Sequence, residues 1–236
     1  MIEAKGHGRG SPEIFRLVKT LGHGGFADTY LAEVLSPQLA HAWGTETVAI
    51  KIPKDRRKEK TLIQELQTNN LVTEVLRDLA GATNVVRYLG FEDYDGKWVM
   101  VMEYVAGGSA RDVVGHLGCQ KPMDIDRAVG IVRGVLQGLS AIHRAGVFHR
   151  DIKPENILLD NQGVPKVADL GIATMLHSNE QASSTVGTLA YMSPEILGPD
   201  GASFESDIWS VGVTLYEMLT GRWPFGDETT PMGSMV

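Results

Sequence analysis

Residues 147–171, VFHRDIKPENILLDNQGVPKVADLG, decide what this chain can fold into and what it can do. Asp151 is followed by Lys153, then by Asn156, and after a longer interval by Asp169. One carboxylate of such a set can orient an attacking hydroxyl and take its proton, while the other carboxylate and the amide can hold a divalent cation against phosphate oxygens. The lysine can balance charge on the moving phosphoryl group. The order of these groups therefore predicts phosphoryl transfer from a metal–nucleotide complex.

This stretch resembles the catalytic and metal-binding loops of eukaryotic-type serine/threonine protein kinases, H-R-D-x-x-x-x-N followed by D-F-G, and those of bacterial members in particular. Leu170 stands where the family has phenylalanine. The resemblance implies that Asp151 is the catalytic base, that Lys153 steadies the γ-phosphate, and that Asn156 and Asp169 bind Mg²⁺ or Mn²⁺ beside ATP. It also implies an α+β, two-lobed protein kinase-like fold, with an antiparallel sheet and one helix in the first lobe and a mostly helical second lobe.

Composition and charge narrow the function classes. The 236 residues are 43% apolar and 22% charged, which is ordinary for a globular protein and enough for one large domain or two lobes. The formal net charge of −7 gives no electrostatic reason to expect binding to nucleic acid or to an anionic membrane. One cysteine, Cys119, excludes an internal disulfide. With no apolar run of membrane-spanning length and no signal-peptide core, the sequence predicts a cytoplasmic location.

A glycine-rich turn is predicted to join two strands within residues 14–34. Its glycines would let the backbone approach phosphate oxygens and point N–H groups at them. A strand on each side of the turn argues against a dinucleotide-binding fold, which needs a helix after the glycines. The next residues, 35–46, are expected to form an extended hairpin loop. By resemblance to the kinase loop, the ATP-covering residues are Leu21, Gly22, His23, Gly24, Gly25, Phe26, Ala27 and Thr29.

A buried strand is predicted at 47–51, and it ends in Lys51. A lysine after Val-Ala-Ile resembles the kinase lysine that binds the α- and β-phosphates. In the family a glutamate from the following helix pairs with this lysine. We expect that helix at about 61–79, with Glu65 as the preferred partner and Glu74 as the alternative.

Two further strands, at 84–89 and 97–102, are predicted on either side of an Asp95–Gly96 hairpin turn. The segment 103–108 then resembles the hinge between kinase lobes, whose backbone groups bond the adenine edge. Met102 would guard the back of that pocket. The adenine contacts that the resemblance implies are Ala49, Met102, Glu103, Val105 and Leu158.

Helical periodicity dominates after residue 109. An amphipathic helix is predicted at 124–145 and another apolar helix at 204–221, which Gly221 would end. A short strand is expected at 157–159. Asp207 resembles the buried aspartate that bonds the backbone of the kinase catalytic loop. The apolar faces are predicted to consist of Ile125, Val129, Val132, Leu136, Leu139 and Ile142 in the first helix, and of Ile208, Val211, Leu215 and Met218 in the second.

The polar segment 172–190 resembles a kinase activation segment. Ser183, Ser184 and Thr185 are the predicted phosphorylation sites, and Arg150 could pair with an added phosphate. Thr188 resembles the threonine that bonds the catalytic aspartate and lysine in serine/threonine kinases.

The resemblance divides the chain into a flexible leader at 1–12, a kinase domain at 13–225 and a tail at 226–236. Within the domain, the first lobe covers 13–102, the hinge 103–108 and the second lobe 109–225. The later family helices, one of which brings an arginine to the glutamate at Glu195, have no counterpart before residue 236, so a truncated second lobe is expected.

The predicted function is ATP-dependent phosphorylation of serine or threonine hydroxyls on protein substrates, with autophosphorylation of the activation segment, for which the chain could dimerise. One alternative is a catalytically weak or inactive kinase-like scaffold in signalling. The intact set of Lys51, Asp151, Asn156 and Asp169 favours the enzyme. A small-molecule kinase is a further alternative. The Ser-Pro-Glu motif at 193–195, which such kinases usually lack, argues against it.

Overall fold

The chain forms two compact units. The structure, a computed structural model, describes residues 14–25, 27–55, 67, 70, 84–114, 122–170, 174–175, 189–197 and 203–225. The first unit contains the described residues up to 70 together with Val86–Tyr104, and the second contains 84–85 and the described residues from 105 onward. Among the helices so described, none is both long and apolar enough to cross a membrane.

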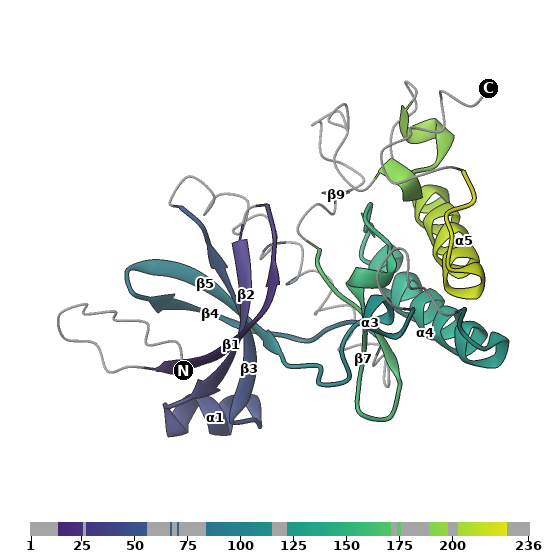
Figure 1. Cartoon of the computed structure of the whole chain (residues 1–236). Coiled ribbons are helices and arrows are strands. Elements are labelled where there is room, and N and C mark those ends of the chain that lie inside the picture. Colours follow the sequence, from purple (N-terminus) through teal and green to yellow (C-terminus); the bar gives the residue numbers. More distant parts are fainter. Residues whose placement is uncertain are drawn as a thin grey trace. The chain divides into compact units, whose positions relative to one another are not determined.

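The first unit is built on one antiparallel sheet of five strands (Figure 1). Both hairpins predicted from the sequence are present, and the β4–β5 turn has Asp95 and Gly96 at φ 54° and 70°, as a tight two-residue turn requires. The fourth strand begins at Tyr88, later than the expected residue 84. In spatial order the strands are β1 (Phe15–His23), β2 (Ala27–Val34), β3 (Thr47–Pro53), β5 (Lys97–Glu103) and β4 (Tyr88–Tyr94).

A short helix, α1 (Pro37–Trp43), stands where an extended loop was expected, so that expectation was wrong. Ser36 caps its first turn through the side-chain oxygen, and Gly44 ends it in the left-handed conformation at φ 68°. Trp43 is buried and stacks on Phe15 with ring centroids 6.1 Å apart. The loop therefore folds because its aromatic residue completes the core of the sheet.

The two faces of this sheet have different contents. Strand pairing sets Ala49 opposite Met102 and Lys51 opposite Met100, and directly paired residues share a face. The alternate residues of the same strands, including Ile50 and its partner Val101, form the core on the other face. The buried members of that core are Phe15, Ala32, Val34, Trp43, Val48, Ile50, Val99 and Val101.

The second unit is mainly helical, and two of its helices, α4 and α5, pack side by side (Figure 1). The short strand predicted at 157–159 is confirmed. The unit's elements are α3 (Ala110–Val114), α4 (Ile125–Arg144), β6 (Val147–Phe148), the 3-10 turn η2 (Pro154–Asn156), β7 (Ile157–Leu159), β8 (Pro165–Val167), β9 (Thr174–Met175), the 3-10 turns η3 (Leu189–Tyr191) and η4 (Pro194–Leu197), and α5 (Phe204–Thr220).

Helix α4 has nearly the predicted bounds, and Asp124 caps it, but the expected buried face was partly wrong. The helix turns its small residues inward, because only they allow close approach. A Cβ on Gly138 would lie 2.4 Å from the backbone oxygen of Asn84. Leu139 and Ile142 are buried as expected, whereas three of the predicted core residues are exposed: Ile125, Val129 and Leu136.

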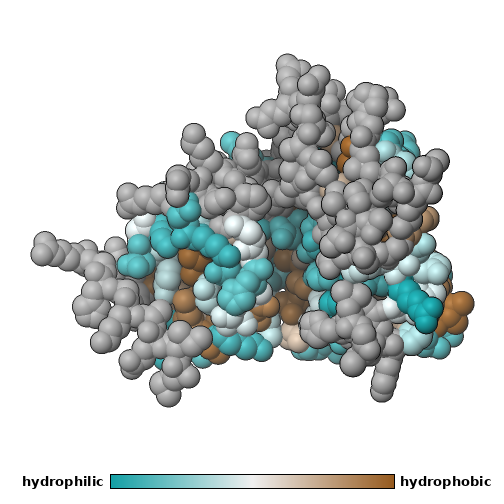
Figure 2. Space-filling view, turned by 45° about the horizontal axis from the view of Figure 1, so that its top comes forward, coloured by the Kyte–Doolittle hydropathy of each residue, from teal (hydrophilic) through white to brown (hydrophobic). Residues whose placement is uncertain are grey.

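Helix α5 begins at a capping box made by Ser203 and Ser206 and ends, as predicted, at Gly221 with φ 68°. On the predicted apolar face, Val211 and Met218 are buried and Ile208 is exposed. Polar residues share the buried face of the helix: Asp207, Ser210, Thr214 and Glu217. Figure 2 shows hydrophobic patches among hydrophilic areas on one face of the described surface.

Candidate active site

Asp151 is the centre of a compact polar arrangement in the loop between β6 and η2. Its carboxylate oxygen Oδ2 accepts a bond from Lys153 Nζ at 2.7 Å and another from Asn156 Nδ2 at 2.9 Å. The same amide nitrogen also donates to the Asp151 carbonyl at 2.8 Å. The side chains of Asp151 and Lys153 are 14% and 20% exposed, so solvent weakens this ion pair less than it would on the open surface. The structure thus brings together three of the predicted catalytic residues.

A buried carboxylate on α5 fixes the backbone of this loop. Asp207 accepts hydrogen bonds from the backbone amides of His149 and Arg150, both at 2.8 Å, and Oδ2 is also 2.8 Å from His143 Nε2. The expected role of Asp207 is therefore confirmed. Arg150 has φ 71°, which is costly for a residue with a side chain, and the two amide bonds hold it there. Burial lowers the pKa of the Arg150 guanidinium, and the negative charge of Asp207, which acts to raise that pKa, offsets only part of the effect.

Asp169 is placed beside the loop by a second set of bonds. His149 is fully buried, and its Nε2 lies 2.9 Å from the carbonyl oxygen of Ala168. The Ala168 amide in turn donates to the carbonyl of Asn156 at 2.9 Å. Asp169 follows with an exposed side chain and φ 64°, a second strained position in this region. The residue before Asp169 is thus bonded directly to Asn156.

The β7 strand lies next to the segment that follows the first unit. Gly107 donates its backbone N–H to the Leu159 carbonyl at 2.8 Å, and a Cβ on Gly107 would lie 2.5 Å from that oxygen. Glycine is therefore required at this position. Val105 is buried and Leu158 is half-buried within the same unit.

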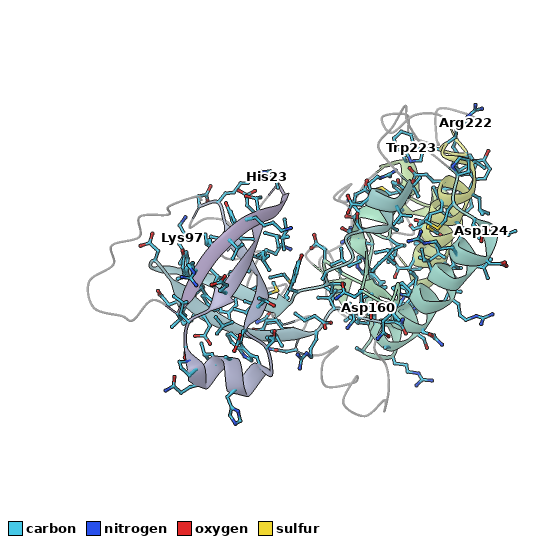
Figure 3. All side chains as sticks on the ribbon, turned by 60° about the horizontal axis from the view of Figure 1, so that its bottom comes forward. His23, Lys97, Asp124, Asp160, Arg222 and Trp223 are labelled. Atoms are coloured by element: carbon cyan, nitrogen blue, oxygen red, sulfur yellow. The ribbon has the colours of Figure 1, made fainter. Side chains whose placement is uncertain are left out.

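The glycine-rich turn of the first unit is closed by one backbone bond, from the Gly24 amide to the Ala27 carbonyl at 3.0 Å. A Cβ on Gly24 would lie 2.8 Å from that carbonyl oxygen, so this glycine is needed for the turn. At the mouth of the hairpin, His23 Nδ1 is 3.1 Å from Asp28 Oδ1, and Lys54 Nζ is 3.5 Å from the same oxygen. His23 lies at the end of β1 (Figure 3).

Four of the other predicted ATP-site residues lie on one face of the sheet. Thr29 pairs with Lys51, and Ala49 pairs with Met102, so their side chains share the face opposite the buried core. The Glu103 amide donates to the carbonyl of Arg87, the residue before β4, at 2.9 Å. Gly22 lies opposite Thr29 in the pairing of β1 with β2. Leu21, the residue before Gly22, is 40% exposed.

Several predicted residues lie outside the described part of the chain. They include both candidate partners of Lys51, although Gln67 and Asn70, in the expected helix, are helical. Lys51 belongs to the first unit, and Asp151, Asn156 and Asp169 belong to the second. The predictions outside the described residues concern Phe26, Glu65, Glu74, Ser183, Ser184, Thr185 and Thr188.

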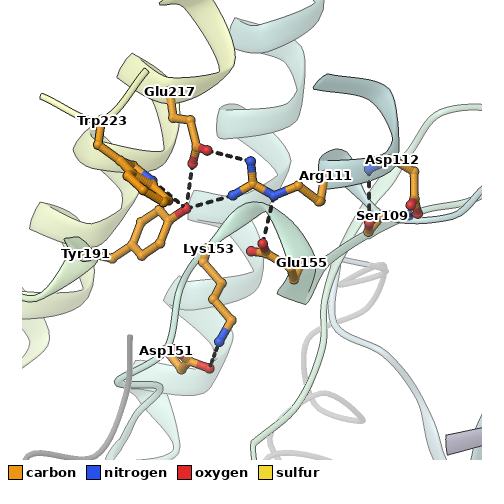
Figure 4. Close-up of polar contacts among 9 residues, drawn as sticks. All are labelled: Ser109, Arg111, Asp112, Asp151, Lys153, Glu155, Tyr191, Glu217 and Trp223. Carbon is orange, nitrogen blue, oxygen red and sulfur yellow. Dashed lines mark hydrogen bonds and ion pairs between the residues drawn. The ribbon is translucent and has the colours of Figure 1, made fainter. Parts of the chain in front are cut away.

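A buried charged cluster next to the loop was not predicted from the sequence. Arg111 on α3 donates through Nε to Glu155 Oε1 at 2.7 Å, through NH1 to Glu217, and through NH2 to the Tyr191 hydroxyl at 2.8 Å (Figure 4). Tyr191 donates to Glu217 Oε2 at 2.6 Å and accepts from Trp223 Nε1 at 3.1 Å. Tyr191 and Glu217 are 80 and 106 residues from Arg111 in the chain, so no local motif reveals the cluster.

Burial and neighbouring charges fix the protonation states of Arg111 and Tyr191 in this cluster. Burial by itself would lower the pKa of Arg111, but hydrogen bonds to Glu217 and Glu155 outweigh it and hold the pKa above its usual range. Burial, and then the nearby Glu217 carboxylate, raise the pKa of the Tyr191 hydroxyl well above its ordinary value. Arg111 is therefore charged, and Tyr191 neutral, at any physiological pH.

The donor set around Asp151 fits a nucleotide-bound divalent cation. Within the described residues, no three His, Cys, Asp or Glu side chains converge into a metal site made by protein alone. Mg²⁺ commonly takes only one or two protein ligands and receives the rest from phosphates and water. Asn156 directs its amide nitrogen to Asp151, which turns the amide oxygen the other way, and the Asp169 carboxylate is exposed. An amide oxygen and a carboxylate are suitable ligands for such a cation.

Comparisons with known proteins show the family of the chain. The family model described as protein kinase domain matches residues 15–234. The SNF1-related protein kinase catalytic subunit alpha KIN12 of Arabidopsis thaliana is 34% identical over 217 residues, 92% of this chain and 41% of that protein. The probable serine/threonine-protein kinase PknB of Bifidobacterium longum (strain NCC 2705) is 32% identical over 231 residues, 91% of this chain and 31% of that protein.

A third relative is more similar over a shorter stretch. The serine/threonine-protein kinase PknL of Mycobacterium tuberculosis is 44% identical over 132 residues, 55% of this chain and 32% of that protein. The chain spans between 31% and 41% of the length of these three relatives.

Proposed function

This chain belongs to the protein kinase family, and from that premise we propose that it transfers the γ-phosphoryl group of ATP to serine or threonine hydroxyls of protein substrates. The observation that carries the proposal is the Asp151 carboxylate, which Lys153 and Asn156 contact on a loop fixed by Asp207. A base held by several bonds is already oriented for an incoming hydroxyl, which is the main contribution that a kinase makes to this reaction.

Each loop residue has a separate task in the proposed mechanism. Asp151 accepts the hydrogen bond of the substrate hydroxyl and takes its proton late in the transfer. Lys153, which lies 2.7 Å from Asp151, places a positive charge where the γ-phosphate develops negative charge. Asn156 and Asp169 hold the divalent cation, Mg²⁺ or Mn²⁺, which when bound offsets charge on the phosphate oxygens.

Residues of the first unit would bind the nucleotide. Lys51 contacts the α- and β-phosphates, and the backbone of the glycine-rich turn covers them. We propose that Glu65, or alternatively Glu74, orients Lys51. The remaining ATP contacts proposed in this unit are Leu21, Gly22, His23, Gly24, Gly25, Phe26, Ala27, Thr29, Ala49, Met102 and Glu103, and the second unit is proposed to add Val105 and Leu158.

The preference for serine or threonine acceptors rests on Lys153. A lysine two residues after the predicted catalytic aspartate resembles the pattern of serine/threonine kinases. The three relatives named above are protein kinases, and two of them are named serine/threonine-protein kinases. We also propose that the chain autophosphorylates in trans, within a dimer, at Ser183, Ser184 or Thr185. The proposed location is the cytoplasm.

Changing Asp151 to Asn tests the mechanism. The variant should lower turnover by roughly 10²–10⁴-fold, because an amide cannot accept the proton, while ATP binding persists. The assay incubates the chain with labelled ATP, Mg²⁺ and a generic basic protein acceptor. Asp126→Asn, at an exposed position on α4, is the matched control. Equal transfer by wild type and Asp151→Asn would show that Asp151 does not have this role. A wild-type chain that binds ATP without transferring phosphate would favour the non-catalytic scaffold.

A further inference from the structure

We propose that Arg111 is a positioning residue for phosphoryl transfer, acting through Glu155 on the turn that carries Asn156. The inference rests on the proposed function and deepens it. Arg111 touches neither the predicted base nor the predicted metal ligands in any contact described above. Its guanidinium instead joins α3, η2, η3 and α5, through Glu155, Tyr191 and Glu217 (Figure 4).

The anchored end of this arrangement is buried. Glu217 has a fully buried side chain, and the Arg111 side chain is 9% exposed. A buried carboxylate is costly unless a cation and further hydrogen-bond donors compensate it. Arg111 and the Tyr191 hydroxyl supply both donors, one to each oxygen of Glu217. The guanidinium is therefore held in one place and one orientation, as its planar fork of donors requires.

The other end of Arg111 holds a more exposed group. The Glu155 side chain is 44% exposed, and its Oε1 is 2.7 Å from Arg111 Nε. Without Arg111, this carboxylate could turn to solvent. Glu155 lies between Pro154 and Asn156 in η2, and Lys153 at the start of that turn provides no side-chain cap. The ion pair with Arg111 thus ties η2 to the buried core.

A shift of η2 would reach the reacting groups directly. Asn156 follows Glu155, and its side-chain Nδ2 donates to both the carboxylate and the carbonyl of Asp151. The Asn156 carbonyl also receives the Ala168 amide, next to Asp169. Misplacement of catalytic groups by about 1 Å can cost as much as 100-fold in rate. Loss of Arg111 should therefore lower kcat more than it changes the KM for ATP.

Tyr191 connects a second segment to the same guanidinium. Its hydroxyl contacts Arg111 and Glu217, and its backbone carbonyl accepts from Ser210 Oγ at 2.8 Å. The position of η3 and the position of η2 therefore depend on one shared side chain. Tyr191→Phe, which keeps the ring and removes the hydroxyl, should reproduce the Arg111 effect in weaker form.

The test measures kcat and the KM for ATP of the chain with a generic protein acceptor. Arg111→Met should lower kcat by about 10- to 100-fold, with the KM for ATP changed by less than about threefold. Arg111→Lys should recover part of the loss, because a lysine keeps the charge without the fork. The matched control, Arg127→Met, changes an exposed arginine on α4 and should leave both constants unchanged. Combining Arg111→Met with Glu155→Gln should cost no more than Arg111→Met alone, since both act on one path.

Backbone amide hydrogen exchange of Glu155 and Asn156, the two residues of η2 that carry an N–H, gives a readout that does not depend on activity. The backbone N–H of Asn156 donates to the Lys153 carbonyl at 3.0 Å. Exchange of this hydrogen should be faster in Arg111→Met and intermediate in Arg111→Lys. If Arg111→Met does not fold, Glu155→Gln carries the test, because it leaves Arg111, Glu217 and Tyr191 in contact. Unchanged kcat and exchange in a folded variant, or fully additive losses in the double variant, would overturn the positioning role. No transfer by wild type, with the expected exchange pattern, would contradict the proposed function alone.

Discussion

The loop of the second unit that carries Asp151 and the glycine-rich turn of the first unit are both held by an aspartate, but in very different surroundings. Asp207 has a side chain 1% exposed and accepts two backbone amides. Asp28 has a side chain 21% exposed and contacts His23 and Lys54, which are 72% and 43% exposed. Buried bonds to backbone fix one geometry, whereas exposed ion pairs contribute little and are screened by salt.

The difference suits the two tasks that we propose. The catalytic base and the residues that bind the metal ion must keep fixed distances to one another, so the loop that carries the base is hydrogen-bonded to a helix. A turn that covers phosphates must admit and release a nucleotide, so weak exposed contacts are sufficient there. The strained backbone at Arg150 and Asp169 belongs to the fastened loop, whose bonds compensate its cost.

The same substitution in both regions gives the largest contrast. Asp207→Ala should lower the free energy of unfolding by roughly 2–5 kcal/mol, since two buried amides lose their acceptor. Asp28→Ala should lower it by less than about 1 kcal/mol. Urea unfolding of both variants measures the difference. Equal losses would contradict the contrast between the two regions.

Glycine packing sharpens the account of the second unit. Gly138→Ala should destabilise it by about 1–3 kcal/mol, because the added Cβ would lie 2.4 Å from the rigid Asn84 carbonyl. Gly130, on the same helix, has no atom within 4 Å of an added Cβ. Gly130→Ala should therefore stabilise the helix by about 0.5–1 kcal/mol. Thermal unfolding of the two variants checks the prediction, and a Gly138→Ala protein as stable as wild type would disprove the close approach.

Alkaline pH should reveal a smaller effect in the first unit. Burial, with a contribution from the Glu92 carboxylate, raises the pKa of Tyr88 to about 12. The unfolded chain ionises this tyrosine near pH 10, so the stability it contributes is complete below that pH. That stability should be lost as the pH rises from about 10 to about 12. Unfolding free energies of wild type should fall more steeply over this range than those of Tyr88→Phe; parallel curves would refute the shift.

Much of the catalytic loop could be predicted because its chemistry depends on residues close together in sequence. The spacing from Asp151 to Asn156 places both in one loop, and helical periodicity with Gly221 located α5. The role of Asp207 came from the resemblance, and the structure confirms it.

Other features depend on contacts that sequence spacing does not show. The α4 face was misread because apolar size was taken as the sign of burial, whereas Gly134 and Gly138 are the residues that pack closely. Helix α1 had a recognisable signal, Ser36 before it, Pro37 at its first position and Gly44 after it, but its stability comes from Trp43 against the sheet. The Arg111 cluster joins distant segments, and the only clue was a glutamate on the buried stripe of α5.

The central proposal is that Lys51 binds the phosphates of ATP and that Asn156 and Asp169 hold its metal ion. An experimental structure of the chain with Mg²⁺ and a non-hydrolysable ATP analogue tests it most directly. The account predicts Lys51 against the phosphates, the metal ion between Asn156 and Asp169, and Asp151 facing the terminal phosphate. A nucleotide bound elsewhere, or a metal ion that neither Asn156 nor Asp169 contacts, would contradict it.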